Sequence, residues 1–310
     1  MTGSRRGKSA SRRASETSGD SAAKQAPGDT APIAGGTREE YGIFDFGYAG
    51  DAGAAAHYQD PEYYTATYAN RRHDVAYYVQ KARLSRGPVL EYGVGNGRIA
   101  LHVARAGVQV TGIDLSPAML NDFRARLALE PKQVRARVTL IEGDMRTTRV
   151  EERFALVIAP FNAMLHLYDR RDMEAFLAGV RQHLRDDGKF MFDFSVPQPE
   201  DLARDPERRY PAPPLRHPET GEVVLYAERF EYDPLRQLLL VRMEFSPTGE
   251  SPAYSVPLTH RQYFPREMEA LLHYNGFSEI LYTADFTDQA ADRSVDSIVV
   301  SCRQRPDFAG

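Results

Sequence analysis

Cysteine is almost absent from this chain of 310 residues, and its scarcity excludes two kinds of site. The single Cys302 cannot form an internal disulfide, and no zinc site can be assembled from thiolates. No group of His, Cys and Asp residues shows metal-ligand spacing either, so we expect no metal. One cysteine is typical of a reducing compartment, and we expect a cytoplasmic location.

Long apolar runs are missing as well. The stretch 1–20 is rich in Ser and Arg but lacks the apolar core of a secretory signal. No run approaches the length that spans a membrane, so no membrane association is expected. Residues 1–40 hold few large apolar side chains and cannot bury enough surface to fold, which predicts a disordered tail.

Charge is unevenly distributed along the chain. The net charge is −4, with +2 in residues 1–40 and −6 in the remainder. An acidic folded part does not favour a surface that follows phosphates, so a nucleic-acid partner is not expected. The basic residues of the tail could still tether the chain to a macromolecule, although a solvated tail explains them equally. They are Arg5, Arg6, Lys8, Arg12 and Arg13.

From Pro88 onward, strand and helix patterns alternate, which is typical of a parallel sheet covered by helices on both faces. We expect an α/β fold, a Rossmann-like seven-stranded sheet with an antiparallel β insertion after strand 5. The expected strands are 89–92, 108–113, 138–141, 155–159, 189–194, 277–282 and 297–302. The expected helices are 98–105, 117–129, 171–184 and 265–274, with Asp187-Gly188 as the stop of the third.

Two further regions flank this pattern. Residues 41–87 are rich in tyrosine and predict a helical lid, with one helix starting at Asp60-Pro61 and another over 72–83. Seven prolines between 197 and 218 predict a long irregular crossing. The β-type runs 223–232 and 237–245, joined by a hairpin, then predict an antiparallel flap within 196–262. The core domain would comprise 88–195 and 263–310.

A glycine turn lies between the first expected strand and helix. Its glycines, at 93, 95 and 97, allow the backbone to approach a ligand, and the following helix presents free N–H groups. The dinucleotide fingerprint requires its third glycine where this chain has Arg98. Glu91, just before the turn, would also repel a pyrophosphate. An NAD-linked oxidoreductase is therefore disfavoured.

Acidic residues, Glu91, Asp114 and Asp144, stand at the carboxyl ends of the first three strands. Asp114 can accept hydrogen bonds from both ribose hydroxyls, and Asp144 can accept from an adenine amine while the Met145 backbone contacts a ring nitrogen. Three such acids suit a ligand without phosphates, and S-adenosylmethionine, with its positive sulfonium, fits. Taken singly, Asp114 could instead cap the next helix, and Asp144 could be a turn residue.

The segments 91–98, 112–116, 143–145 and 159–167 resemble the successive motifs of class I S-adenosylmethionine-dependent methyltransferases, over about residues 60–303. In style the chain resembles the glycine N-methyltransferases and the bacterial sugar-amine N,N-dimethyltransferases, which share a Tyr/Arg-rich lid and an insertion after the fifth strand. The resemblance implies methyl transfer to a nitrogen or oxygen of a small-molecule acceptor. A methyltransferase for protein or RNA, and a catalytically silent cofactor-binding module, are the alternatives.

The resemblance also implies site residues. An Arg of the lid holds the cofactor carboxylate in the glycine enzymes, and here Arg71 or Arg72 stands at a comparable distance before the glycine turn. The implied cofactor contacts are Tyr64, Tyr68, Arg72, Glu91, Gly93, Gly95, Gly97, Asp114, Leu115, Asp144 and Met145.

Three residues are candidates for the acceptor side. An Asn and a His follow the fourth strand in the glycine enzymes, and here they are Asn162 and His166. His166 is the candidate general base, or else a histidine at a helix start or in contact with the cofactor, without a role in proton transfer. Asn162 and Tyr263 would form the substrate wall, unless they only pack. A homo-oligomer is left open.

The chain also departs from the patterns of its presumed relatives. The glycine enzymes place an Arg just after the fifth-strand acid, but Asp193 is followed by Phe194 and Ser195, so glycine itself is not expected as the acceptor. The sequence after the fourth strand, Ala-Pro-Phe-Asn over 159–162, also lacks the Asn/Asp-Pro-Pro-aromatic signature of enzymes that methylate DNA bases or glutamine side chains.

Overall fold

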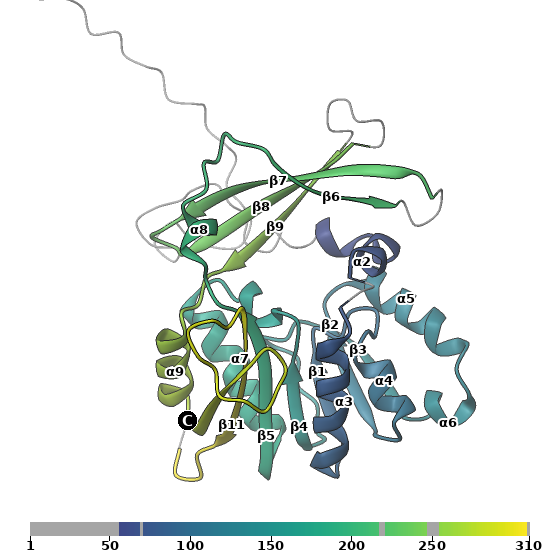
Figure 1. The fold of residues 1–310 in the computed structure, drawn as a ribbon. Coiled ribbons are helices and arrows are strands. Elements are labelled where there is room, and N and C mark those ends of the chain that lie inside the picture. The colour runs from purple at the N-terminus through teal and green to yellow at the C-terminus, as the bar shows by residue number, and fades with distance from the viewer. Residues whose placement is uncertain (1–55, 69–70, 217–220, 247–253, 309–310) are drawn as a thin grey trace, which may run out of the picture. The chain divides into compact units, whose positions relative to one another are not determined.

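The computed structural model describes residues 56–68, 71–216, 221–246 and 254–308. The predicted tail over 1–40 and the first part of the predicted lid, residues 41–55, lie outside the described residues. The described chain forms one seven-stranded and one four-stranded sheet (Figure 1).

The seven-stranded sheet has the order β10-β11-β5-β4-β1-β2-β3. Strands β1 to β5 run parallel, whereas β11 pairs antiparallel with both β5 and β10. This arrangement confirms the predicted fold class. The strands are β1 Val89–Tyr92, β2 Val110–Asp114, β3 Val138–Glu142, β4 Phe154–Ala159, β5 Leu184–Ser195, β10 Phe277–Ala284 and β11 Ser297–Gln304.

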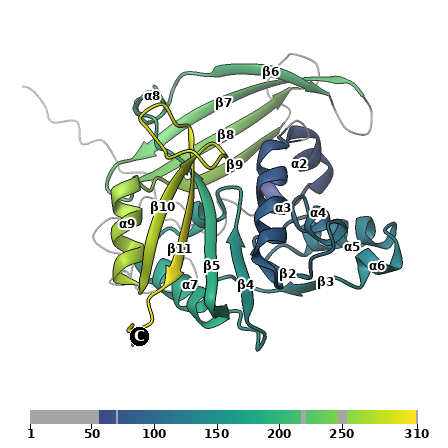
Figure 2. The ribbon, with the colours of Figure 1, turned by 60° about the horizontal axis from the view of Figure 1, so that its bottom comes forward.

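Helices cover both faces of this sheet and create two apolar cores (Figure 2). One core holds side chains of α3 His73–Ser85, α4 Ala100–Arg105 and α5 Pro117–Ala128, and the other holds those of α7 Arg170–His183 and α9 Pro265–Tyr274. A short α6, Lys132–Arg135, follows α5. The sequence of α7 explains why one of its faces packs on the sheet. Its buried residues recur at helical spacing: Met173, Phe176, Leu177 and Val180.

The prediction that Asp187-Gly188 stops the third helix was wrong. Helix α7 ends at His183, and β5 begins at the next residue, so Gly188 lies inside the strand. A Cβ at Gly188 would lie 2.9 Å from the carbonyl oxygen of Arg185 and 3.0 Å from that of Phe154. Close approach of two backbones, and not a helix end, therefore explains this glycine.

The predicted antiparallel insertion is present as the sheet β6-β7-β8-β9, which we call the flap. Its strands are β6 Tyr210–Arg216, β7 Val223–Asp233, β8 Leu238–Ser246 and β9 Tyr254–Arg261. The predicted hairpin between β7 and β8 is confirmed, since Asp233 Oδ1 accepts hydrogen bonds from the backbone N–H groups of Leu235 and Arg236 at 2.9 and 3.1 Å.

The prediction of an irregular crossing between 197 and 218 was wrong in part. It contains a short α8, Pro199–Leu202, and the strand β6. Three of the seven residues of β6 are prolines, yet β6 is an edge strand with a neighbour on only one side. A proline lacks the N–H that a second neighbour would need, so an edge strand is where it is tolerated.

Three short helices bring distant segments together near one end of the main sheet. They are η1 Ala56–Tyr58 and α2 Pro61–Tyr68 from the predicted lid, and η2 Ala163–His166 after β4. Both η1 and η2 contact β9 of the flap, and α2 contacts α5. The region between them is where the candidate site lies.

Candidate active site

A cavity of about 350 Å³ lies at the carboxyl ends of β1, β2, β3 and β4. Ligands of open α/β sheets bind at this edge. The lining comes from the glycine turn, the ends of β2 and β3, the turn after β4, and the segment from η1 to α2. Nine of the predicted site residues line it: Tyr64, Glu91, Gly93, Gly95, Asp114, Leu115, Asp144, Met145 and His166.

The glycine turn adopts a backbone that other residues rarely take. Gly93, Gly95 and Gly97 have φ angles of 65°, 54° and 82°. Gly97 was predicted to contact the cofactor, but it does not line the cavity. A Cβ at this position would lie 2.4 Å from the ring of Phe123, so Gly97 allows α5 to pack against the turn.

Glu91 is the acid whose surroundings point most directly to a ligand. Its side chain is 2% exposed and lines the cavity, and Oε2 has no hydrogen-bond partner among the described residues. Burial raises the pKa of Glu91 well above its ordinary value, against the pull of the nearby Arg98. A buried acceptor without a protein partner at a cavity wall can accept from a donor on a ligand, or from water or an ion. The ammonium group of S-adenosylmethionine is such a donor.

Asp114 holds the glycine turn and faces the same cavity. Its Oδ2 accepts from the Gly95 N–H at 2.6 Å, and its Oδ1 accepts from the Ser116 N–H at 2.8 Å. Burial raises the pKa of Asp114, although these backbone hydrogen bonds oppose the shift. The helix cap of α5 is the Ser116 hydroxyl, which accepts from the Met119 N–H. Asp114 is therefore not the cap of that helix, which leaves it available to the ribose.

Asp144 is engaged by its own neighbour. Its carboxylate accepts from the backbone N–H of Arg146 at 2.8 Å and from the guanidinium at 2.6 Å, and that guanidinium also donates to Asp172 on α7 at 2.9 Å. Burial works to raise the pKa of Asp144, but the contacts with Arg146 outweigh it and lower the pKa. Asp144 is thus a turn residue, as the alternative had it, and a cavity residue at once.

Tyr58 is a cavity residue that sequence reasoning missed. Its hydroxyl lies 2.8 Å from Nε2 of His166, and its backbone carbonyl accepts from the Ser116 hydroxyl at 3.2 Å. It belongs to the tyrosine-rich segment that predicted a lid, but nothing in that segment distinguishes it from its neighbours. Tyr64 lines the cavity as predicted, whereas Tyr68 does not and packs its ring against Phe161.

The predicted lid arginine, Arg72, does not reach the cavity. It is exposed at the start of α3, and its neighbour Arg71 points elsewhere, with its guanidinium 3.5 Å from Asp74. Two other arginines line the cavity, Arg146 after β3 and Arg98 directly after the glycine turn. Arg98 donates two hydrogen bonds to the fully buried Asp74, at 2.9 and 2.6 Å. A cation beside Glu91 matches the carboxylate that accompanies the cofactor's ammonium group.

Three histidines lie close together beside Tyr58, and one of them, His166, lines the cavity. The rings of His166 and His260 lie 5.1 Å apart, and His57 packs edge-on against Tyr58. Burial lowers the pKa of His166 and of His57 to about 4, and it lowers that of His260 well below the ordinary value. All three rings are therefore uncharged near neutral pH.

The other two predicted acceptor residues are not brought to the cavity. The Asn162 side chain is hydrogen-bonded to Ser195 on β5. Tyr263 is 3% exposed in the core, and its hydroxyl donates to the carbonyl of Leu167. Neither residue lines the cavity, so neither forms the substrate wall there.

Two negative findings hold for residues 56–68, 71–216, 221–246 and 254–308. Within them, no cluster of three or more His, Cys, Asp or Glu side chains is arranged to bind a metal ion. None of the helices in these ranges combines the length and the apolar character needed to cross a membrane.

Comparison with known families agrees with this geometry. Residues 89–188, which run from β1 into β5, match the family model described as a methyltransferase domain. The match confirms the resemblance on which the sequence prediction was built.

A curated relative and two solved structures extend the comparison beyond this domain. The chain is 27% identical over 121 residues to a dTDP-3-amino-3,4,6-trideoxy-alpha-D-glucopyranose N,N-dimethyltransferase of Streptomyces venezuelae, over 39% of this chain and 48% of that protein. The chain spans less than half the length of the curated relatives it matches.

The solved structures are similar over most of their length. The CcbJ methyltransferase from Streptomyces caelestis has a TM-score of 0.65 at 23% identity, over 78% of this chain and 96% of that chain. The glycopeptide N-methyltransferase MtfA complexed with S-adenosyl-L-methionine has a TM-score of 0.51 at 26% identity, over 73% and 86%. The chain therefore shares its fold with solved methyltransferases.

Proposed function

We propose that the protein transfers a methyl group from S-adenosylmethionine to an amine nitrogen of a small-molecule acceptor. The observation that carries the proposal is one cavity lined by Glu91, Asp114 and Asp144 at the ends of β1, β2 and β3. The names of two relatives, an amino-sugar N,N-dimethyltransferase and a glycopeptide N-methyltransferase, favour nitrogen over oxygen as the accepting atom.

The cofactor would be held by residues that already face the cavity. Glu91 would accept from its ammonium group, Asp114 from the ribose hydroxyls, and Asp144 from the adenine amine beside Met145. When bound, S-adenosylmethionine supplies an electrophilic methyl carbon on a positively charged sulfur. The protein's main task is then alignment, and positioning of this kind can supply about 7–11 kcal/mol of the barrier.

Tyr58 and His166 would orient the acceptor nitrogen. Both line the cavity, and their side chains are hydrogen-bonded to each other. Because burial lowers the pKa of His166 to about 4, its ring is a poor proton acceptor for an ammonium group. The acceptor amine must therefore arrive uncharged, with its lone pair free, and His166 directs it as a neutral hydrogen-bonding group. This role replaces that of a strong general base.

A methyl-transfer screen tests the proposal. The purified chain is offered S-adenosylmethionine with panels of amines, amino sugars, phenols and neutral sugars, and S-adenosylhomocysteine is measured. We expect turnover with an amine-bearing compound. Turnover confined to phenols or sugar hydroxyls would refute nitrogen as the acceptor, and binding of NAD without binding of S-adenosylmethionine would refute the cofactor.

Removal of residues 1–40 separates a small acceptor from a macromolecular one. If the acceptor is small, the shortened protein should keep its turnover. If the basic tail tethers a protein or RNA substrate, binding at physiological salt should weaken on removal of the tail.

The proposal includes the absence of a nucleic-acid partner, on the grounds of charge, and a cytoplasmic location, on the grounds of the single cysteine. A homo-oligomer stays a prediction.

A further inference from the structure

The turn after β4 holds two successive residues in a conformation that side chains disfavour. Phe161 has a φ of 58°, and Asn162 has a φ of 61° with a ψ of 16°. Asn tolerates this left-handed region better than most residues, whereas a bulky Phe is rarely found there. Such strain persists only where the surrounding structure fixes it, and it concentrates at functional sites.

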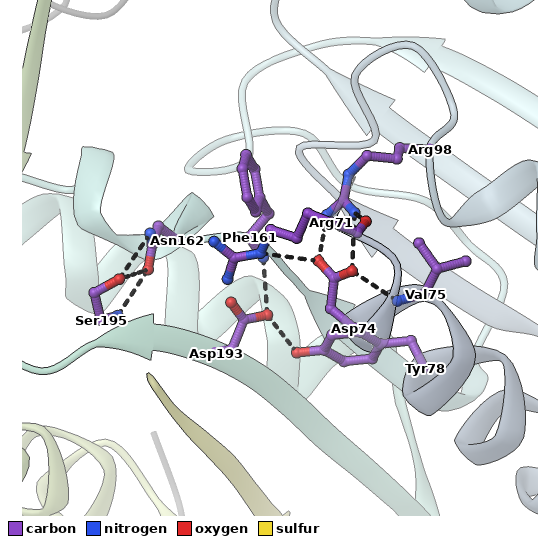
Figure 3. A network of polar contacts seen from close by, with 9 residues as sticks. All are labelled: Arg71, Asp74, Val75, Tyr78, Arg98, Phe161, Asn162, Asp193 and Ser195. Carbon is purple, nitrogen blue, oxygen red and sulfur yellow. Dashed lines mark hydrogen bonds and ion pairs between the residues drawn. The ribbon is translucent and has the colours of Figure 1, made fainter. Parts of the chain in front are cut away.

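Strand β5 and helix α3 together fix Phe161 (Figure 3). The fully buried Asp193 accepts from the Phe161 N–H at 2.8 Å and from the Tyr78 hydroxyl at 2.7 Å. The Phe161 ring lies against two guanidinium groups, those of Arg71 at 4.7 Å and Arg98 at 4.6 Å from its centroid. Backbone and ring of one strained residue are thus held by separate partners.

The same strand fixes Asn162. The Ser195 N–H donates to Oδ1 of Asn162 at 2.8 Å, and Nδ2 of Asn162 lies 3.2 Å from the Ser195 hydroxyl (Figure 3). Ser195 stands two residues after Asp193 on β5. Since β5 pairs with β4 and with β11, it is an interior strand of the sheet and a rigid support.

The turn connects the cofactor side of the cavity with the acceptor side. Pro160, Phe161, Ala163 and His166 all line the cavity. A Cβ placed on Gly93 would lie 3.2 Å from the Cβ of Ala163, so the turn abuts the glycine turn directly. Any change in the backbone at 161 and 162 would move His166 relative to the cofactor site.

We infer that Asn162 and Asp193 are positioning residues that hold this turn, so that His166 and the Phe161 wall keep a fixed distance from the glycine turn. The expected effect on turnover rests on the proposed methyl transfer. The holding of the turn itself rests on the hydrogen bonds of Asn162 and Asp193 described above. Asn162 would act through the backbone, without touching the acceptor, which differs from its predicted role as part of the substrate wall.

Glycine and alanine at position 162 distinguish the two roles. Glycine adopts positive φ without steric strain, whereas alanine does not, and neither carries the amide that contacts Ser195. We expect Asn162→Ala, which loses both the amide and the tolerance of positive φ, to lower kcat about tenfold or more. Asn162→Gly loses only the amide and should lower kcat by a smaller factor, about threefold. Calorimetric Kd values for S-adenosylhomocysteine should change by less than about threefold in both. Equal losses of kcat in the two variants would overturn the inference.

A second pair of variants tests Asp193. An asparagine at 193 keeps a carbonyl oxygen for the Phe161 N–H and the Tyr78 hydroxyl, whereas alanine removes it. Asp193→Asn should keep kcat within about threefold, and Asp193→Ala should lower it about tenfold or more. Loss in both variants would show that the charge matters and not the hydrogen bond. If Asp193→Ala does not fold, the comparison at position 162 decides.

Hydrogen–deuterium exchange gives a readout that needs no acceptor. In the peptide spanning 160–166, Asn162→Ala should exchange faster than the wild type and faster than Asn162→Gly. Unchanged exchange together with unchanged kcat in Asn162→Ala would overturn the positioning role. A wild type that neither binds S-adenosylmethionine nor transfers methyl would instead overturn the proposed function, so the two failures are distinguishable.

Discussion

The hydroxyl of Tyr58 lies 2.8 Å from Nε2 of His166, although the two residues stand 108 positions apart in the chain. The same tyrosine accepts a hydrogen bond from Ser116, next to the turn that carries Asp114. Tyr58 therefore connects η1 to His166 through its hydroxyl and to Ser116 through its backbone carbonyl.

Removal of the Tyr58 hydroxyl should affect turnover more than cofactor binding. Tyr58→Phe keeps the ring that packs against His57 but leaves His166 without its partner. We expect kcat to fall about tenfold, because an unpaired ring is less well oriented, and the Kd for S-adenosylmethionine to change by less than about threefold. Steady-state kinetics and calorimetry measure both.

Tyr282→Phe is the matched control for this variant. This variant likewise removes a single tyrosine hydroxyl, one that donates to the carbonyl of Pro265 at 2.9 Å. Tyr282 lies on β10 and does not line the cavity. A loss of about 1 kcal/mol of stability with unchanged kcat is expected. If both variants lose the same activity, the contact between Tyr58 and His166 has no special part in turnover.

Cofactor affinity should depend on pH through Glu91. Burial raises the pKa of this carboxyl well above its ordinary value, and only the ionised form can pair with the ammonium group. Binding should therefore weaken as the pH falls, starting at a higher pH than for an exposed glutamate. In Glu91→Gln we expect this dependence to disappear and the affinity at neutral pH to fall about tenfold or more.

Glu151→Gln provides the comparison for Glu91→Gln, because Glu151 is exposed and does not line the cavity. The cofactor affinity of Glu151→Gln should depend on pH in the same way as that of the wild type. A Glu91→Gln protein that binds S-adenosylmethionine as tightly as the wild type at every pH would exclude Glu91 from the site.

Asp114→Ala should abolish detectable cofactor binding in calorimetry. The substitution removes the proposed acceptor for the ribose hydroxyls. It also leaves the Gly95 N–H without the hydrogen bond of 2.6 Å that it donates to Asp114. Asp186→Ala removes an aspartate that is fully exposed and should leave binding unchanged. Tight binding by Asp114→Ala would remove the ribose role, provided that circular dichroism shows both variants to be folded.

His166 should contribute to the pH dependence of stability. Burial lowers its pKa in the folded protein to about 4, while the unfolded chain keeps the ordinary value of 6.5. Protons then bind the unfolded chain preferentially, so the contribution is complete above pH 6.5 and is lost as the pH falls towards 4.

The variant His166→Gln should flatten this slope. The free energy of unfolding, measured by urea titration between pH 6.5 and 4, should change less steeply by up to about 1.4 kcal/mol per pH unit. Parallel slopes for variant and wild type would show that His166 stays as exposed to protons in the folded protein as in the unfolded chain.

The sequence was a good guide wherever a local pattern determines the structure. The hairpin before Leu238 and the helix from Pro265 to Tyr274 follow from turn residues and helix signals that act over a few positions. The same is true of the glycine turn and the acids at 91, 114 and 144, which the parallel sheet necessarily collects at one edge.

Contacts between distant segments were beyond such patterns. The residues around Tyr58 do not predict its contact with His166, and those around Asn162 do not predict its contact with Ser195. Both contacts form only after strands and helices have packed. Arg72 was predicted from the resemblance and from its distance before the glycine turn, and neither of these pointed to Arg98. The prolines of β6 suggested a loop, because an edge strand cannot be recognised before the sheet order is known.

The position of β11 has a consequence for how the protein is made. This strand, residues 297–304, is inserted between β5 and β10, which precede it in the chain. During synthesis, β5 therefore waits with one edge unpaired until residue 304 has left the ribosome, and an open edge invites pairing with other chains. Premature release before that point should leave a product that aggregates, even though every residue of the cavity has already been translated.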